Sequence, residues 1–150
     1  TSLTAPSGAI VGTTDTQTLT NKTLSTGTVI PVTIGIACSD ETTALTTGTA
    51  KATFRMPHAM TLTSVRASVG TAPAGSTIIV DINEGGSTIM TTNKLSIDAG
   101  EKTSTTAATA AGITDTSLAD DAEITIDIDQ VGSTTAGAGL KVWLIGTRTL

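Results

Sequence analysis

The clearest alternation of apolar and polar residues in the chain is Ala122-Glu123-Ile124-Thr125-Ile126-Asp127-Ile128-Asp129. Successive side chains of a β-strand point to opposite faces of its sheet, so this spacing predicts a strand. We expect one face of the strand to contact a core through Ile124, Ile126 and Ile128. We expect the other face to meet water through Glu123, Thr125, Asp127 and Asp129.

Shorter strand patterns recur on both sides of this stretch. They cover residues 29–36, 49–56, 60–69 with a bulge near Ser64, 77–83, 88–90, 94–98, 101–106 and 140–146. Turns rich in Gly separate several of them, and residues 106–112 are expected to form a loop or one helical turn. Pro31 restricts the start of the first pattern to a sheet edge or a strand end. Trp143, in the last pattern, is expected to be the largest buried side chain.

The composition favours the same fold class. The 150 residues include 35 threonines and 15 glycines, and 1% of them are aromatic. Thr is stiff at χ1 and Gly is costly in a helix, whereas Thr, Val and Ile suit strands. We therefore predict an all-β fold, with an antiparallel β-sandwich or jelly roll over residues 29–150.

Residues 1–28 differ from this body. Their central stretch is Gly12-Thr13-Thr14-Asp15-Thr16-Gln17-Thr18-Leu19-Thr20-Asn21-Lys22-Thr23-Leu24, with two large apolar residues in thirteen. So little apolar surface cannot offset the entropy lost on ordering. A flexible linker and an extended arm that packs on other chains are both open. We favour the arm or shaft segment, because Thr prefers extended backbone and the stretch is no Gly/Ser spacer.

The totals of charged, aromatic and sulfur-containing residues disfavour several classes of function. Eight Lys and Arg face thirteen Asp and Glu, giving a net charge of −5, and no basic cluster points to nucleic acid. One Trp, one Phe and no Tyr leave no stacking platform for bases. The sequence contains no run of about 18 apolar residues, so it predicts no helix that spans a membrane. One cysteine allows no intrachain disulfide and no cysteine metal cage.

The reactive side chains are scattered, so we expect no enzymatic site and no cofactor. His58 is interpreted as a loop histidine and Cys38 as a small buried hydrophobic residue. Asp81 and Glu84 are interpreted as ordinary turn chemistry. A group of carboxylates is interpreted as a solvated sheet face, with a surface or inter-subunit cation as the alternative. These carboxylates are Asp120, Asp121, Glu123, Asp127 and Asp129.

The stretch from Gly12 to Leu24 closely resembles a GTTDTQTLTNKTL element of tail-fibre and related virion proteins of tailed bacteriophages. Residues 60–70, 79–83 and 126–133 are similar to a β domain of phage structural proteins. The resemblance implies a homotrimer on the particle surface, with a β-rich head. It also implies an N-terminal arm for attachment or shaft formation. It carries over no catalytic residues.

Three classes of function follow from these features. The leading one is a non-enzymatic virion protein, a trimeric fibre or head fibre that contacts other virion proteins through its arm and contributes to host attachment. The alternative is a capsid decoration protein that stabilises the shell. A carbohydrate-binding module that recognises a host-surface glycan comes third, because such sites need an exposed aromatic ring and Trp143 is expected to be buried.

Overall fold

The structure of the chain is a computed structural model, and it describes residues 26–150. Nine strands and one 3-10 turn lie in this part of the chain. The strands are β1 (Val29–Ala37), β2 (Gly48–Arg55), β3 (Met60–Ser68), β4 (Ile78–Glu84), β5 (Ser87–Thr88), β6 (Leu95–Ile97), β7 (Ser117–Leu118), β8 (Glu123–Gln130) and β9 (Lys141–Thr149). The turn, η1, covers Ser104–Thr106.

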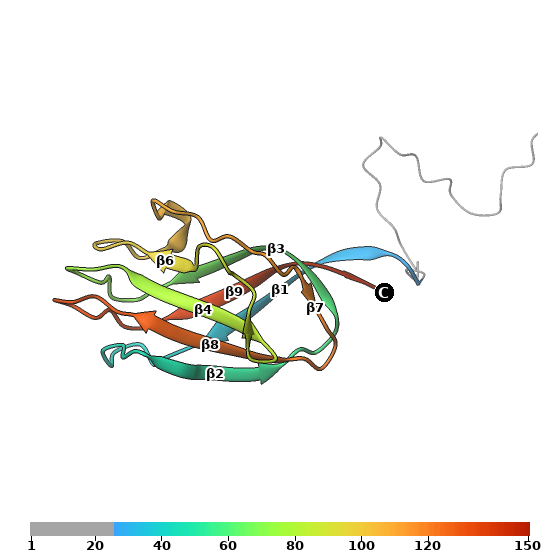
Figure 1. Cartoon of the computed structure of the whole chain (residues 1–150), viewed down its shortest axis with the longest axis horizontal. Coiled ribbons are helices and arrows are strands. Elements are labelled where there is room, and N and C mark those ends of the chain that lie inside the picture. Colours follow the sequence, from blue (N-terminus) through green and yellow to red (C-terminus); the bar gives the residue numbers. More distant parts are fainter. Residues whose placement is uncertain (1–25) are drawn as a thin grey trace, which may run out of the picture.

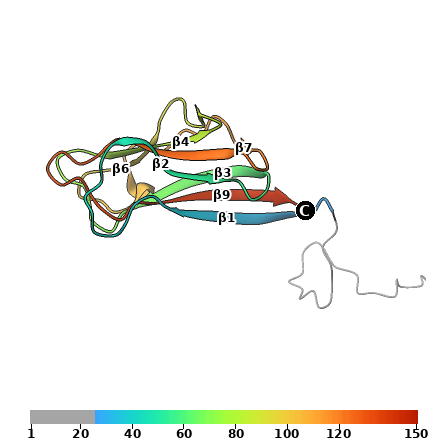
Figure 2. The same cartoon turned by 90° about the horizontal axis from the view of Figure 1, so that it is seen from below.

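The strands form two antiparallel sheets that pack face to face (Figures 1 and 2). Sheet A has the order β1-β9-β3-β7, and sheet B has the order β2-β8-β4-β5, with β6 also paired to β4. The chain crosses from one sheet to the other at each of the steps from β1 to β4. This strand order is that of a jelly roll. The predicted all-β sandwich is confirmed.

The core lies between the two sheets and follows the alternation in the sequence. In β8, Ile124 and Ile126 are fully buried and Ile128 is 2% exposed, as predicted. Neighbouring β4 adds Ile78, Val80 and Ile82, and β9 in the facing sheet adds Val142 and Leu144. Because these side chains come from the inner faces of both sheets, they hold the two layers together.

A bulge in β3 occurs where the sequence predicts one. The register of β3 against β9 shifts between Leu62 and Ser64, and Leu62 pairs with Gly146. A Cβ atom at Gly146 would lie 2.1 Å from the carbonyl oxygen of Thr61. The two backbones therefore approach this closely only because residue 146 has no side chain.

The predicted strand over residues 101–106 is wrong. Thr103 makes an isolated bridge to Ser68, after which the chain turns into η1. The hydroxyl of Thr103 accepts a hydrogen bond from the N–H of Thr105 at 3.2 Å and so caps the turn. The hydroxyl of Ser104 accepts a bond from the N–H of Ala67 at 2.9 Å, which fastens the turn to β3.

Candidate functional site

The predicted assembly arm, from Gly12 to Leu24, lies outside the described residues. The structure does show where the following chain enters the sandwich. The N–H of Gly27 donates to the carbonyl of Leu150 at 2.7 Å, and the N–H of Leu150 donates to the carbonyl of Thr28 at 3.0 Å. The first and last described residues therefore lie side by side at one end of the sandwich, which we call the base (Figure 1).

The opposite end carries three loops, residues 38–47, 69–77 and 131–140, which we call the distal loops. β1 starts at the base, where Val29 pairs with Thr149, and ends far from it, where Ala37 pairs with Lys141. Each distal loop connects two strands at this far end. Backbone hydrogen bonds join them, including Leu45 N–H to Gly137 O at 2.9 Å and Gly70 N–H to Ala138 O at 2.8 Å. The distal loops thus form one connected surface.

Trp143 is not the buried residue that the sequence predicts. In β9 the side chains of Val142 and Leu144 point into the core, so Trp143 between them lies on the outer face of sheet A and is partly exposed. Its indole lies over Gly35 of β1, where a Cβ atom would be 3.2 Å from Nε1. The alternation that buries its neighbours therefore places this ring on the surface.

A groove of about 420 Å³ opens beside the ring, and we call it the Trp143 groove. It is lined by Arg66, Ala67, Ser68, Thr103, Thr105, Trp143 and Ile145. Arg66 pairs directly with Trp143 across β3 and β9, so the two side chains stand next to each other on the same face. Among residues 26–150 the guanidinium of Arg66 makes no hydrogen bond or ion pair.

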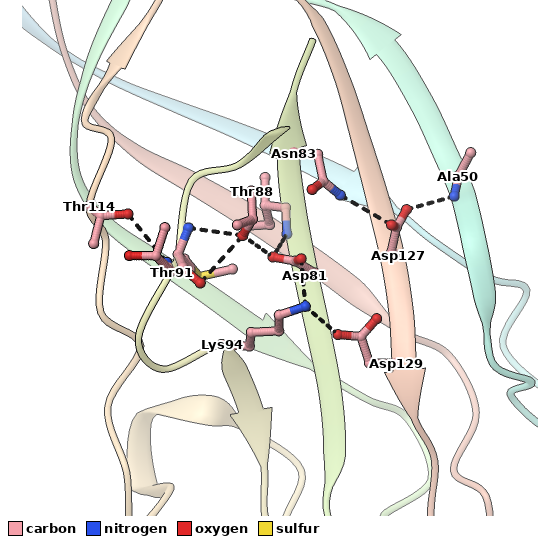
Figure 3. A network of polar contacts seen from close by, with 11 residues as sticks. Ala50, Asp81, Asn83, Thr88, Thr91, Lys94, Thr114, Asp127 and Asp129 are labelled. Atoms are coloured by element: carbon pink, nitrogen blue, oxygen red, sulfur yellow. Dashed lines mark hydrogen bonds and ion pairs between the residues drawn. The ribbon is translucent and has the colours of Figure 1, made fainter. Parts of the chain in front are cut away.

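A polar network covers the outer face of sheet B (Figure 3). Lys94 Nζ lies 2.7 Å from a carboxylate oxygen of Asp81 and 2.7 Å from one of Asp129. The hydrogen bond with Asp129 and, to a smaller extent, the one with Asp81 raise the pKa of Lys94 above its ordinary 10.5. Asp81 is 5% exposed, so its interpretation as turn chemistry is wrong.

The predicted solvated face of carboxylates is therefore only partly correct. Asp127 accepts a hydrogen bond from the N–H of Ala50 at 2.7 Å and one from the amide of Asn83 at 3.1 Å. Asp120, Asp121 and Glu123 are exposed, as predicted. Within residues 26–150 no three His, Cys, Asp or Glu side chains are grouped so that they could hold a metal ion.

The two lone candidates for chemistry lie apart. His58 follows β2 in the connection to β3, as predicted, and its buried Nε2 has no hydrogen-bond partner. Cys38 is buried, as predicted, and burial raises the pKa of its thiol to about 11. A thiol with such a pKa is not a nucleophile near neutral pH.

Comparisons with known protein families, curated proteins and solved structures found no match. Within the described part of the chain, no helix is long and apolar enough to cross a bilayer.

Proposed function

We propose that the chain is a non-enzymatic structural protein on the surface of a bacteriophage particle, where it forms a homotrimer. Residues 1–28 act as the arm that contacts other virion proteins, and the sandwich acts as the head of a fibre or spike. The resemblance of residues 12–24 to phage fibre elements supports this. Jelly rolls occur in viral capsid and lectin domains, which is support by analogy of fold alone.

The observation that carries the proposal of self-association is the edge of β1, which no other strand of residues 26–150 covers and which we call the free edge. This strand is nine residues long, VIPVTIGIA, and carries no charge. Among the described residues, Val29 at its start is the one large apolar side chain that is exposed, at 61%. A long, uncharged edge strand presents unpaired backbone groups to any other chain, so proteins usually protect or cover it.

The other sheet edges in residues 26–150 are protected in such ways. β2, at one edge of sheet B, carries Lys51 and Arg55, and its register shifts between Gly48 and Ala52. β5, β6 and β7 contain two or three residues each. In β1, Pro31 is the one comparable device, and it protects only the part nearest the base. The rest of β1 is therefore suited to be covered by a neighbouring copy.

The position of the base fits the same arrangement. β1 begins at Val29, directly after the residues that bond to Leu150, so the arm and the free edge start at the same end. Copies that meet along β1 would bring their arms together at the base. In a trimer each β1 edge would meet a different surface of the next copy, and the ring would close after three copies.

Mass photometry of the full chain tests the assembly, and two matched variants test the edge. Thr33→Lys puts a charge on β1, while Thr53→Lys puts the same charge on β2, and both threonines are exposed on edge strands. We expect a trimer for the unaltered chain and for Thr53→Lys, and smaller species for Thr33→Lys. A monomer at micromolar concentration for the unaltered chain would contradict the proposal.

The alternative, a capsid decoration protein, shares the arm and the self-association. Locating the chain in a reconstruction of the intact particle distinguishes the two. A position on the tail or on an outward stalk supports the fibre, whereas a position on the capsid threefold axes supports decoration of the shell.

A further inference from the structure

We propose that the Trp143 groove binds an anionic saccharide, whose ring packs on the indole of Trp143 and whose acidic group pairs with Arg66. The proposal deepens the attachment role given above by naming the class of ligand. The binding itself depends only on the groove, so it can be measured whatever the oligomeric state proves to be.

The groove provides both kinds of contact that a sugar needs. Ligand sites combine apolar or aromatic surface with a few placed polar groups. Here Trp143 and Ile145 of β9 supply the apolar surface, and the hydroxyls of Thr103 and Thr105 lie along the opposite wall, 3.0 Å from each other. The C–H faces of a sugar ring suit an aromatic ring, and its hydroxyls suit threonines that can both donate and accept.

Arg66 makes the preferred ligand anionic. Its exposed guanidinium has no partner among the described residues, and it is the one charged side chain that lines the groove. A guanidinium presents paired N–H donors that match a carboxylate or a sulfate. An acidic group on the sugar would therefore gain a charge-assisted contact without breaking an existing one.

The charge distribution favours an anion at this face in spite of the chain's net charge of −5. The four strands of sheet A carry Arg66, Lys141 and Arg148 and contain no Asp or Glu. Five of the carboxylates belong instead to β4 and β8 of sheet B. Counted over their strands, sheet A is thus more positive than sheet B. On its outer face the cation left unpaired among the described residues is Arg66, because Lys141 is paired with Glu41 and Arg148 lies opposite Ile30 on the core side.

A larger pocket on sheet B is a weaker candidate. It measures about 500 Å³ and contains no aromatic side chain. Two of its polar side chains already bond within the chain: Gln130 donates to the carbonyl of Thr77 at 2.7 Å, and Asp98 accepts from the N–H of Ala108 at 2.8 Å. A ligand that used Gln130 or Asp98 would have to displace these bonds, whereas Arg66 has no partner within residues 26–150.

The position of the groove also suits attachment. Trp143 lies two residues from Lys141, which pairs with Ala37 at the end of sheet A farthest from the base. Gly35, beneath the indole, belongs to β1, but the groove opens on the other side, toward β3 and η1. A neighbouring copy on the free edge of β1 would therefore leave the groove open.

Trp143 is the only tryptophan in the chain, so its fluorescence reports directly on the groove. The full chain is titrated with three disaccharides of similar size: one neutral, one with a uronic acid and one with a sulfate. We expect a change in emission with one or both acidic sugars, and the two acidic arms distinguish a carboxylate from a sulfate ligand. No response to either acidic sugar, or an equal response to the neutral one, overturns the proposal.

Two matched variants test the role of Arg66. Arg66→Gln should weaken binding of the acidic sugar by roughly tenfold or more, since a charge-assisted contact is lost. Arg148→Gln removes the same charge from the end of sheet A nearest the base, where Arg148 pairs with Ile30. It should leave binding within about twofold, because charges farther apart than about 10 Å are largely screened. Equal weakening by both variants would show general charge attraction and overturn the site.

Two further controls test the aromatic contact and the class of ligand. Trp143→Leu keeps an apolar side chain and should abolish sugar binding measured by calorimetry, with folding checked by circular dichroism. Binding that survives this variant overturns the stacking contact. A single-stranded oligonucleotide that binds as well as the acidic sugar would assign the groove to nucleic acid instead. If these tests fail, the proposed sugar site is wrong, but the proposed trimer still stands or falls on mass photometry alone.

Discussion

Lys94 reaches across the outer face of sheet B and places its Nζ 2.7 Å from a carboxylate oxygen of Asp81, a side chain that is only 7% exposed (Figure 3). Asp81 is also bonded by its Oδ1 to the hydroxyl of Thr88 and, at 3.0 Å, to the N–H of Ile82. A buried carboxylate is tolerated in a sheet only when such partners surround it. Asp81 therefore helps to hold the segment that covers it to the sheet, beside the backbone bond from the N–H of Ile89 to the carbonyl of Ile82 and the Lys94–Asp129 pair.

The first prediction concerns this pair. Replacing Lys94 by Met should lower the free energy of unfolding by about 1–3 kcal/mol, because Asp81 stays buried with one partner fewer. Lys94 is itself 37% exposed, which keeps the loss below that of a fully buried pair. Urea denaturation measures the change.

Lys102→Met is the matched control, because the exposed Lys102 side chain makes no hydrogen bond or ion pair in residues 26–150. Its effect should be smaller than about 0.5 kcal/mol. The pKa of Lys94 is raised in the folded chain, so its contribution to stability is complete below its ordinary 10.5 and is lost as the pH rises through the folded value. Equal losses for both variants at neutral pH would contradict the assigned contact.

The second prediction concerns acid pH and the first distal loop. Hydrogen bonds, chiefly from the N–H of Thr43 and also from the N–H of Thr42, lower the pKa of Asp40 from 3.8 to about 2. Because the folded pKa is the lower one, Asp40 stabilises the fold above pH 3.8, and this contribution is lost as the pH falls toward 2. NMR titration of the Asp40 carboxyl carbon should show the lowered midpoint.

The matching stability experiment compares the unaltered chain with Asp40→Ala. The difference in unfolding free energy should be largest near neutral pH and should shrink between pH 3.8 and about 2. A difference that stays constant over this range would argue against the bonds to Thr42 and Thr43.

The third prediction concerns the single thiol. Burial raises the pKa of Cys38 to about 11, so very little thiolate forms at pH 8, and the side chain is also shielded. A thiol reagent such as DTNB should react slowly with the native chain and fast after unfolding in urea. Fast reaction with native protein would mean that the loop over Cys38 opens readily.

The fourth prediction concerns the close approach at the β3 bulge. Gly146→Ala would place a Cβ atom 2.1 Å from the Thr61 carbonyl oxygen, so the strands must separate. We expect a loss of roughly 1–3 kcal/mol or more, the usual range for overpacking. In Gly112→Ala the nearest atom would be 3.6 Å away, in ordinary contact, and this variant should unfold at nearly the same temperature as the unaltered chain. Matching losses would contradict the assigned register.

Much of the sandwich could be predicted because several core strands, β8 above all, alternate between apolar and polar residues. The isoleucines of β8, the bulge at Ser64 and the edge position of Pro31 all follow from local pattern and are confirmed. β7 was missed because it consists of Ser117 and Leu118 alone, which is too short to show alternation.

The sites were harder to predict, since they depend on what covers each outer face. Alternation places both Asp81 of β4 and Trp143 of β9 on the outer faces of their sheets. The segment after β5 then buries Asp81, whereas Trp143 stays partly open above Gly35. The sequence suggested the opposite for both, because a lone tryptophan usually packs inside and an aspartate near glycines usually belongs to a turn. Both outcomes depend on contacts between different strands and loops, such as Lys94 with Asp81 and Trp143 with Gly35, which the alternation within one strand does not report.

The hydrogen bonds between Gly27, Thr28 and Leu150 have a practical consequence for how the protein is handled. A peptide tag fused after Leu150 would emerge beside residues 27 and 28. Immobilisation on a biosensor chip through such a tag would point the distal loops away from the chip and toward the analyte. The same tag would crowd whatever the leading residues bind, so binding at the base should be assayed with a label attached to the distal loops instead.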